Sequence, residues 1–155
     1  MRRNYSDLYL MSQVTEARVQ ADIISLLKNY RIDAVPIDAG GRRARGRMIG
    51  AAKNAGINIG HLASVKTGSA IPSGFADIEA TLAPSGRALY IECKAPAWIS
   101  PTLAIVRGAG IPSREQLDFL LEKHRRGAVV LVAWSTRDVE NHLGSLLVEN
   151  RKALG

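Results

Sequence analysis

Apolar side chains recur at helical spacing in three segments of the chain. In residues 13–30 they return every three or four positions, which predicts an amphipathic helix with Ser12 as its N-cap. Residues 113–126 show the same spacing and precede Gly127, a residue type that commonly follows the last turn of a helix. A third segment, residues 135–152, predicts a final helix. The leucines expected to face the core from the second helix are Leu117, Leu120 and Leu121.

The strand signals lie between these helices. Residues 76–82 and 88–94 predict the two strands of a β-hairpin, because the turn sequence "APSGR" joins them. The continuous apolar run at 128–134 is typical of a strand that is covered on both faces. Residues 33–38 predict a short edge strand, since they contain a proline. Residues 61–68 predict one further strand.

The order of these elements predicts an α/β or α+β domain, in which helices pack on a mixed β-sheet. The whole chain, 1–155, is expected to form a single domain, since its length is typical of one. Residues 1–12 are interpreted as an N-terminal extension. Residues 97–112 have no clear period and are interpreted as a long connection.

The positive charge of the chain is concentrated in one window. The sequence contains 21 Lys and Arg against 14 Asp and Glu, a net charge of +7, yet residues 39–76 contain no acid. Arginine pairs well with phosphate oxygens, and a field of this sign attracts polyanions. We therefore predict a nucleic-acid-binding surface that includes a basic loop at 40–56, although a solvated loop would explain the same residues. The cations of this window are Arg42, Arg43, Arg45, Arg47, Lys53 and Lys66.

Composition also excludes several classes of protein. With one cysteine, Cys93, the chain cannot form an intramolecular disulfide. No run of about 18 apolar residues occurs, which argues against a membrane-spanning helix. The first residues, "MRRNYSDLYLMSQ", lack the apolar centre of a signal peptide. We expect a cytoplasmic protein with no membrane partner.

The candidate chemistry lies in the predicted hairpin. Because side chains alternate along a strand, Ile91 and Cys93 share the core face, and Glu92 and Lys94 share the other, which we expect to face outward. Asp77 begins the partner strand, so that pairing brings it close to Glu92. Carboxylates and carbonyls are ligands that Mg²⁺ and Mn²⁺ prefer. The pattern therefore predicts a metal site formed by Asp77, Glu92 and the backbone carbonyl of Cys93, with Lys94 assisting phosphodiester hydrolysis.

These residues resemble a known nuclease signature. "GFAD" at 74–77, followed by "IECK" at 91–94, is similar to the PD-(D/E)XK pattern, in which an Asp after a turn precedes Glu-X-Lys on the next strand. "SREQ" at 113–116, which opens a helix after that strand, is similar to the VRR-NUC branch of this superfamily, as is the acid Glu16 in the first helix. The related archaeal Holliday junction resolvases share this layout. The resemblance extends to Trp134 and so covers most of the chain.

The resemblance implies a restriction-endonuclease-like core and a set of roles. Asp77 and Glu92 would bind Mg²⁺ or Mn²⁺, Lys94 would be the catalytic lysine, Gln116 would support the site and Glu16 would be an additional acid. It also implies homodimers that cleave branched DNA such as four-way junctions, without a small-molecule cofactor, in the cytoplasm of a bacterium or of a phage-infected host.

Two positions depart from the family pattern. Ala76 stands where the family has a proline before the metal-binding Asp, which changes no ligand. The segment 95–112 is longer than expected between the Glu-X-Lys strand and the helix that carries Gln116, and it is interpreted as a substrate loop or a dimer element.

Plainer interpretations of single residues stay open. Ser113 and Gln116 have the spacing of a helix capping box, and Glu16 would complement a helix dipole. Glu79 is interpreted as a solvated strand position, and the Cys93 thiol as a small core side chain. Two other functions also stay open, namely a flap or duplex nuclease without junction preference and a nucleic-acid-binding module that does not cut.

Overall fold

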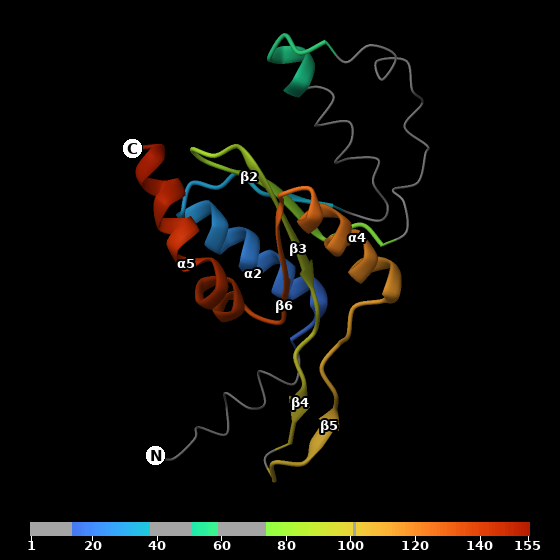
Figure 1. Ribbon diagram of the computed structural model, residues 1–155. Coiled ribbons are helices and arrows are strands. Elements are labelled where there is room, and N and C mark those ends of the chain that lie inside the picture. Colours follow the sequence, from blue (N-terminus) through green and yellow to red (C-terminus); the bar gives the residue numbers. More distant parts are fainter. Residues whose placement is uncertain (1–13, 38–50, 59–73, 101) are drawn as a thin grey trace.

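The computed structural model describes residues 14–37, 51–58, 74–100 and 102–155. They form a mixed α/β fold, in which helices lie on both sides of a four-stranded sheet (Figure 1). The strand predicted at 61–68 lies outside the described residues, as does most of the basic loop at 40–56. Of that loop, residues 51–54 are helical.

Three helices occupy the segments that apolar spacing predicts, namely α2 (Glu16–Asn29), α4 (Arg114–Arg125) and α5 (Thr136–Ala153). The N-cap of α2 is Thr15, whose hydroxyl oxygen accepts a 3.2 Å hydrogen bond from the backbone N–H of Arg18. The predicted cap at Ser12 is therefore wrong, because the helix begins later. No helix among the described residues is long and apolar enough to cross a bilayer.

The main sheet confirms the predicted hairpin and adds a parallel neighbour. Its strands are β1 (Val35–Pro36), β2 (Ile78–Leu82), β3 (Arg87–Cys93) and β6 (Val129–Ala133). Their order is β1-β2-β3-β6, with β1, β2 and β3 antiparallel in turn and β6 parallel to β3. Ile78 pairs with Ile91, so that Asp77 and Glu92 face each other one step beyond the ladder.

The sheet separates two hydrophobic clusters. Ile91 and Cys93 belong to the larger cluster, which α2 and α5 cover. Tyr90 belongs to the smaller cluster, with Leu120 and Phe119 of α4. Figure 1 shows α2 and α5 on one side of the sheet and α4 on the other. Both faces of β3 and β6 are thus covered, as the apolar run of β6 predicts.

This second layer corrects two expectations. Glu92 and Lys94 do not face outward, since Glu92 is 0% exposed and Lys94 is 7% exposed. In α4 Leu120 is buried, but Leu117 and Leu121 are 42% and 52% exposed. The reason is that the ring of Phe119, whose centroid lies 4.5 Å from that of Phe75, supplies much of the apolar contact of α4.

The long connection at 97–112 contains a two-stranded antiparallel sheet. It consists of β4 (Trp98–Ile99) and β5 (Ile105–Arg107), which project away from the main sheet (Figure 1). We call residues 98–107 the arm. Its strands are too short to produce a period in the sequence. Large exposed apolar side chains gather on the arm and just after it, namely Trp98, Ile99, Leu103, Ile105, Val106 and Ile111.

Candidate functional site

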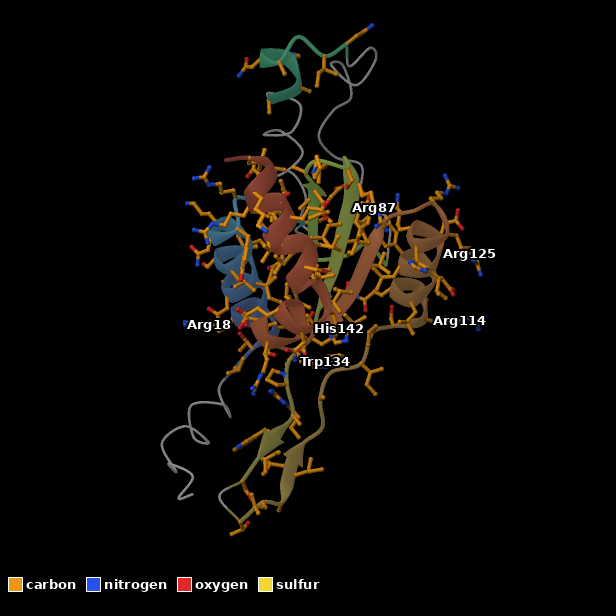
Figure 2. The ribbon with its side chains drawn as sticks, turned by 60° about the vertical axis from the view of Figure 1, so that its left-hand side comes forward. Arg18, Arg87, Arg114, Arg125, Trp134 and His142 are labelled. Atoms are coloured by element: carbon orange, nitrogen blue, oxygen red, sulfur yellow. The ribbon has the colours of Figure 1, made fainter. Side chains whose placement is uncertain are left out.

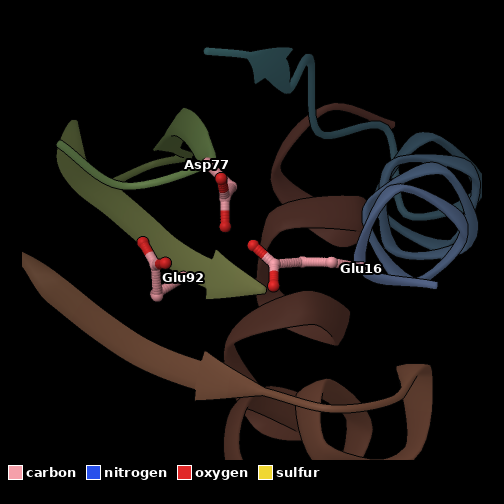
Figure 3. Close-up of side chains that lie close together, drawn as sticks. All are labelled: Glu16, Asp77 and Glu92. Carbon is pink, nitrogen blue, oxygen red and sulfur yellow. The ribbon is translucent and has the colours of Figure 1, made fainter. Parts of the chain in front are cut away.

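Three carboxylates meet at the C-terminal end of β3. Glu16 comes from the first turn of α2, Asp77 directly precedes β2, and Glu92 lies in β3 (Figure 3). One oxygen atom from each carboxylate lies within 4.8 Å of the other two. These residues are 15 to 76 positions apart in the sequence. Pairing of the hairpin strands brings Asp77 to Glu92, and packing of α2 against the hairpin adds Glu16.

Asp77 is held by both its side chain and its backbone. Its Oδ2 atom accepts a 2.7 Å hydrogen bond from the backbone N–H of Cys93. Its backbone carbonyl accepts a 2.8 Å bond from Nε2 of Gln20 and a 2.7 Å bond from the N–H of Ile37. Sequence reasoning missed Gln20 as a positioning residue. The signal was present, because Gln20 lies four positions after Glu16 and hence on the same face of α2.

A buried lysine connects two of the carboxylates. Nζ of Lys94 lies 2.7 Å from Oε1 of Glu92 and 3.3 Å from Oε1 of Glu16. The Lys94 and Glu92 side chains are buried, whereas that of Glu16 is 48% exposed. The network therefore runs from a dry interior to solvent, and Glu16 forms its outer end.

Gln116 makes the contacts of a capping box and also contacts the carboxylate cluster. Its side-chain Oε1 atom accepts a 2.8 Å hydrogen bond from the backbone N–H of Ser113. Its backbone N–H donates a 3.2 Å hydrogen bond to the Ser113 hydroxyl, which completes a capping box. Its Nε2 group donates to Oε1 of Glu92. An amide can do both because its oxygen accepts while its nitrogen donates. The cap of α4 thus orients the amide toward the carboxylate.

The surroundings shift the pKa values of the buried groups. Burial raises the pKa of Glu92 to about 7, although the hydrogen bond from Lys94 opposes the shift. Burial likewise raises the pKa of Asp77, against the stabilising N–H of Cys93. For Lys94, burial favours the neutral form, but the hydrogen bond and attraction to Glu92, together with Glu16, outweigh it and raise the pKa. Lys94 therefore stays positively charged, beside two carboxyl groups whose raised pKa values favour their neutral forms.

Cys93 contributes its backbone to the site. Its thiol is fully buried among apolar side chains, as expected, and burial raises the pKa of that thiol. In a β-strand the N–H and C=O of one residue point to the same edge. Because the N–H of Cys93 donates to Asp77, its carbonyl is directed to the same side as that carboxylate. The predicted role of this carbonyl as a metal ligand stays a prediction.

Two glycines permit the close packing around the cluster. Gly74 has a φ of +87°, and a Cβ atom there would lie 2.7 Å from the backbone of Glu115 in α4. A Cβ atom at Gly110 would lie 3.3 Å from Cβ of Lys94. The carbonyl of Gly110 accepts a 2.8 Å bond from Nε1 of Trp134, which fixes this segment over the lysine. The segment that follows the arm therefore covers Lys94.

The remaining predicted residues are placed only in part. Lys53 is exposed, and the other predicted nucleic-acid-binding cations lie outside the described residues. Glu79, interpreted as a solvated residue, is half-buried, and its Oε1 atom accepts a 3.0 Å bond from the Tyr90 hydroxyl. That expectation is wrong because α4 also covers this face of the hairpin.

The donor set is suited to a divalent cation. Oε2 of Glu92 is fully buried and has no hydrogen-bond partner among the described residues. A buried carboxylate oxygen without a partner is costly, which makes a bound cation a physically reasonable counterpart. The oxygen-only ligands are of the type preferred by Mg²⁺, Mn²⁺ and Ca²⁺. The cluster of Glu16, Asp77 and Glu92 could therefore hold a metal ion.

Comparison with known proteins gives no relative from which a role for the site could be inferred. The chain matches no family model, no curated protein and no solved structure.

Proposed function

We propose that this protein is a metal-dependent endodeoxyribonuclease that hydrolyses phosphodiester bonds in branched DNA, of which four-way junctions are the favoured substrate. The observation that carries the proposal is the convergence of three carboxylates on one point, with a buried, charged lysine beside them. The order Asp77, Glu92, Lys94 on a hairpin and Gln116 on the next helix is consistent with a PD-(D/E)XK core of the VRR-NUC type.

The carboxylates would hold Mg²⁺ or Mn²⁺. A cation bound by Glu16, Asp77 and Glu92 would lower the pKa of its water ligand and offset the charge of a phosphate group. The Cys93 N–H keeps Asp77 turned toward the cluster, and the Gln116 amide keeps Glu92 in place. These contacts position the ligands before substrate binds, which reduces reorganisation during the reaction.

Lys94 acts on the substrate as a donor. Its raised pKa keeps the ammonium group charged at neutral pH, so it donates hydrogen bonds and does not act as a base. In hydrolysis, a water molecule loses a proton to solvent and its oxygen forms a new bond to phosphorus. The bond from phosphorus to the leaving oxygen breaks, and that oxygen takes up a proton. The ammonium group of Lys94 would stabilise the negative charge that builds on the phosphate oxygens.

A homodimer completes the proposal. Two symmetric cuts on a four-way junction require two active sites, and a two-fold dimer is the simplest assembly with that property. The arm supports a contact with a second copy because both of its short strands are edge strands with exposed apolar side chains. Two identical edges related by a two-fold axis can pair antiparallel. The basic loop would contact the phosphate backbone of the DNA.

A cleavage assay tests the function. Purified protein is incubated with labelled four-way junction, flap, duplex and single strand, each with Mg²⁺, Mn²⁺ or EDTA. Paired cuts in the junction that require metal are expected, and Asp77→Asn should abolish them. Glu79→Gln is the matched control, because Glu79 shares a face with Asp77 but contacts Tyr90 instead of the cluster.

Each other outcome has a defined meaning. Equal cutting of flap and duplex would replace junction selectivity with a general nuclease activity. Binding of DNA without cutting in any metal would indicate a nucleic-acid-binding module of the same fold. Cleavage that survives Asp77→Asn would show that the carboxylate cluster is not the active site.

A further inference from the structure

A second candidate site lies at the opposite end of β3. A cavity of about 340 Å³ opens between the turn that precedes β3, the first residues of β3 and the C-terminal end of α4. Its described lining includes the residues Arg87, Tyr90, Lys123 and Arg126. Three of these residues are cationic, and none of the described lining residues is acidic.

Known contacts hold the cationic side chains at the cavity and leave further N–H donors of these side chains to bind a ligand. Nε of Arg87 donates a 2.8 Å hydrogen bond to the carbonyl of Gly127, and Nε of Arg126 donates a 2.6 Å bond to Glu122. A guanidinium group carries five N–H donors, so each arginine has four more. Nζ of Lys123 lies 5.2 Å from the centroid of the Tyr90 ring, a cation–π contact that keeps the ammonium group beside the cavity.

The charge around the cavity favours an anion. The C-terminal end of a helix carries a partial negative charge of roughly half a unit, which offsets only part of three cations. Among the described residues, two acids lie nearby: Glu122 is paired with Arg126, and Glu79 accepts a hydrogen bond from the hydroxyl of the lining residue Tyr90. Arg125 adds a further exposed cation at the end of α4. Figure 2 shows Arg87 and Arg125 toward the α4 side of the molecule, whereas Arg18 lies on the side of α2.

The cavity is related to the carboxylate cluster by one strand. Arg87 and Glu92 both belong to β3 and lie five positions apart. At roughly 3.3 Å per residue in a strand, this separation is about 17 Å. This distance is several times the roughly 3.4 Å by which successive phosphates of one DNA strand rise along the helix axis, so that the cavity and the cluster would contact different phosphates.

We propose that this cavity binds a phosphate group of the nucleic-acid backbone other than the phosphate at the carboxylate cluster. The proposal rests on the proposed function for the identity of the polyanion. Arginine forks and an ammonium group on an aromatic surface are suited to a phosphate and make no use of base identity. The cavity would fix the direction in which a helical branch leaves the active site.

Binding in EDTA tests the proposal separately from cleavage. Fluorescence anisotropy with a labelled duplex is measured over a series of salt concentrations for the intact chain, for Arg126→Gln and for Lys123→Gln/Arg126→Gln. The control is Arg151→Gln/Lys152→Gln, which removes the same charge from exposed positions at the end of α5. Thermal melts check that each variant is folded. The double variant loses the contact between the Lys123 ammonium group and the Tyr90 ring, and if that loss destabilises it, the single variant Arg126→Gln still tests the cavity.

The cavity variants should bind at least about tenfold more weakly, and their salt slopes should fall by about one unit for each phosphate that is no longer neutralised. A change no larger than that of the control, with DNA still bound and cut, would overturn the cavity assignment and leave the nuclease proposal intact. Failure of the intact chain to bind or cut any DNA would remove both.

Inorganic phosphate distinguishes a free anion from a backbone phosphate. It is titrated while the amide resonances of Tyr90 and Gly127 are followed. Saturation that DNA cannot displace would mean that the cavity serves a free phosphate, and the backbone assignment would be wrong. Displacement of weakly bound phosphate by duplex DNA is the result we expect.

Discussion

Nζ of Lys94 lies 2.7 Å from Oε1 of Glu92, and both side chains are almost wholly buried. Oppositely charged groups in a dry site depend strongly on each other, because the desolvation of each is compensated only by its partner. The second oxygen of Glu92 nevertheless has no partner in the described part of the chain. The site therefore holds its lysine firmly and keeps one carboxylate oxygen available to a cation.

A divalent cation should stabilise the protein. Binding to the folded state alone raises the free energy of unfolding by about 2.7 kcal/mol at a ligand concentration of about 100 times Kd. We expect the melting temperature to rise with Mn²⁺ or Mg²⁺ and to be unaffected by the cation in Asp77→Asn. Glu79→Gln should retain the rise. A similar rise in Asp77→Asn would place the cation elsewhere.

The metal-free protein should lose stability as Glu92 ionises. Its pKa is about 7 when folded against an ordinary value of 4.5, so the folded state binds the proton more tightly. The contribution of Glu92 to stability is then present below about pH 4.5 and is lost as the pH rises through about 7. In EDTA, the stability of the unaltered chain relative to Glu92→Gln should fall by on the order of 1–3 kcal/mol across this range, because glutamine does not ionise. Chemical denaturation at several pH values measures the difference, and parallel pH profiles would contradict it.

Removal of the lysine charge alone should be more harmful than removal of the pair. Lys94→Met leaves the ionised form of Glu92 without its partner, and breaking a buried pair in this way typically costs about 3–5 kcal/mol. Combining it with Glu92→Gln should recover much of that stability, since no buried charge remains. A double-mutant cycle of unfolding free energies at pH 8 measures the coupling. Additive effects would show that the two groups are independent.

Gly74 should tolerate alanine less well than Gly86. Both have positive φ values, which cost an alanine about 1–2 kcal/mol. Only at Gly74 would the new Cβ atom meet backbone, 2.7 Å from Glu115, whereas nothing lies within 4 Å at Gly86. We expect a further destabilisation of about 1–3 kcal/mol in Gly74→Ala from this overlap. Equal melting temperatures for the two variants would show that α4 can shift without cost.

The arm should control self-association. Ile105→Asp introduces a charge into its exposed apolar surface and should reduce the mass measured by sedimentation from that of a dimer to that of a monomer. Ile57→Asp is the control, because Ile57 is also an exposed isoleucine but lies outside the arm. A dimer that survives Ile105→Asp would exclude the arm as its contact, and a monomeric parent chain would exclude the dimer.

Local pattern was sufficient for the three main helices and for the strands of the main sheet, but not for the two short strands of the arm. The spacing of apolar residues located α2, α4 and α5, and the "APSGR" turn located the hairpin of β2 and β3. These signals are reliable because a helix face and a hairpin are set by residues close together in the chain. The same hairpin places Asp77 opposite Glu92, so that the proximity of these two carboxylates could also be predicted.

Only the tertiary structure decided what surrounds that pair. The alternation of side chains along β3 predicted that Lys94 shares a face with Glu92. It did not predict that α4 buries this face, that Gln20 binds the carbonyl of Asp77, or that the Gln116 amide reaches Glu92. Each depends on contacts between elements distant in sequence. The sequence by itself thus determined which groups can act together, and packing determined that they are dry, paired and shifted in pKa.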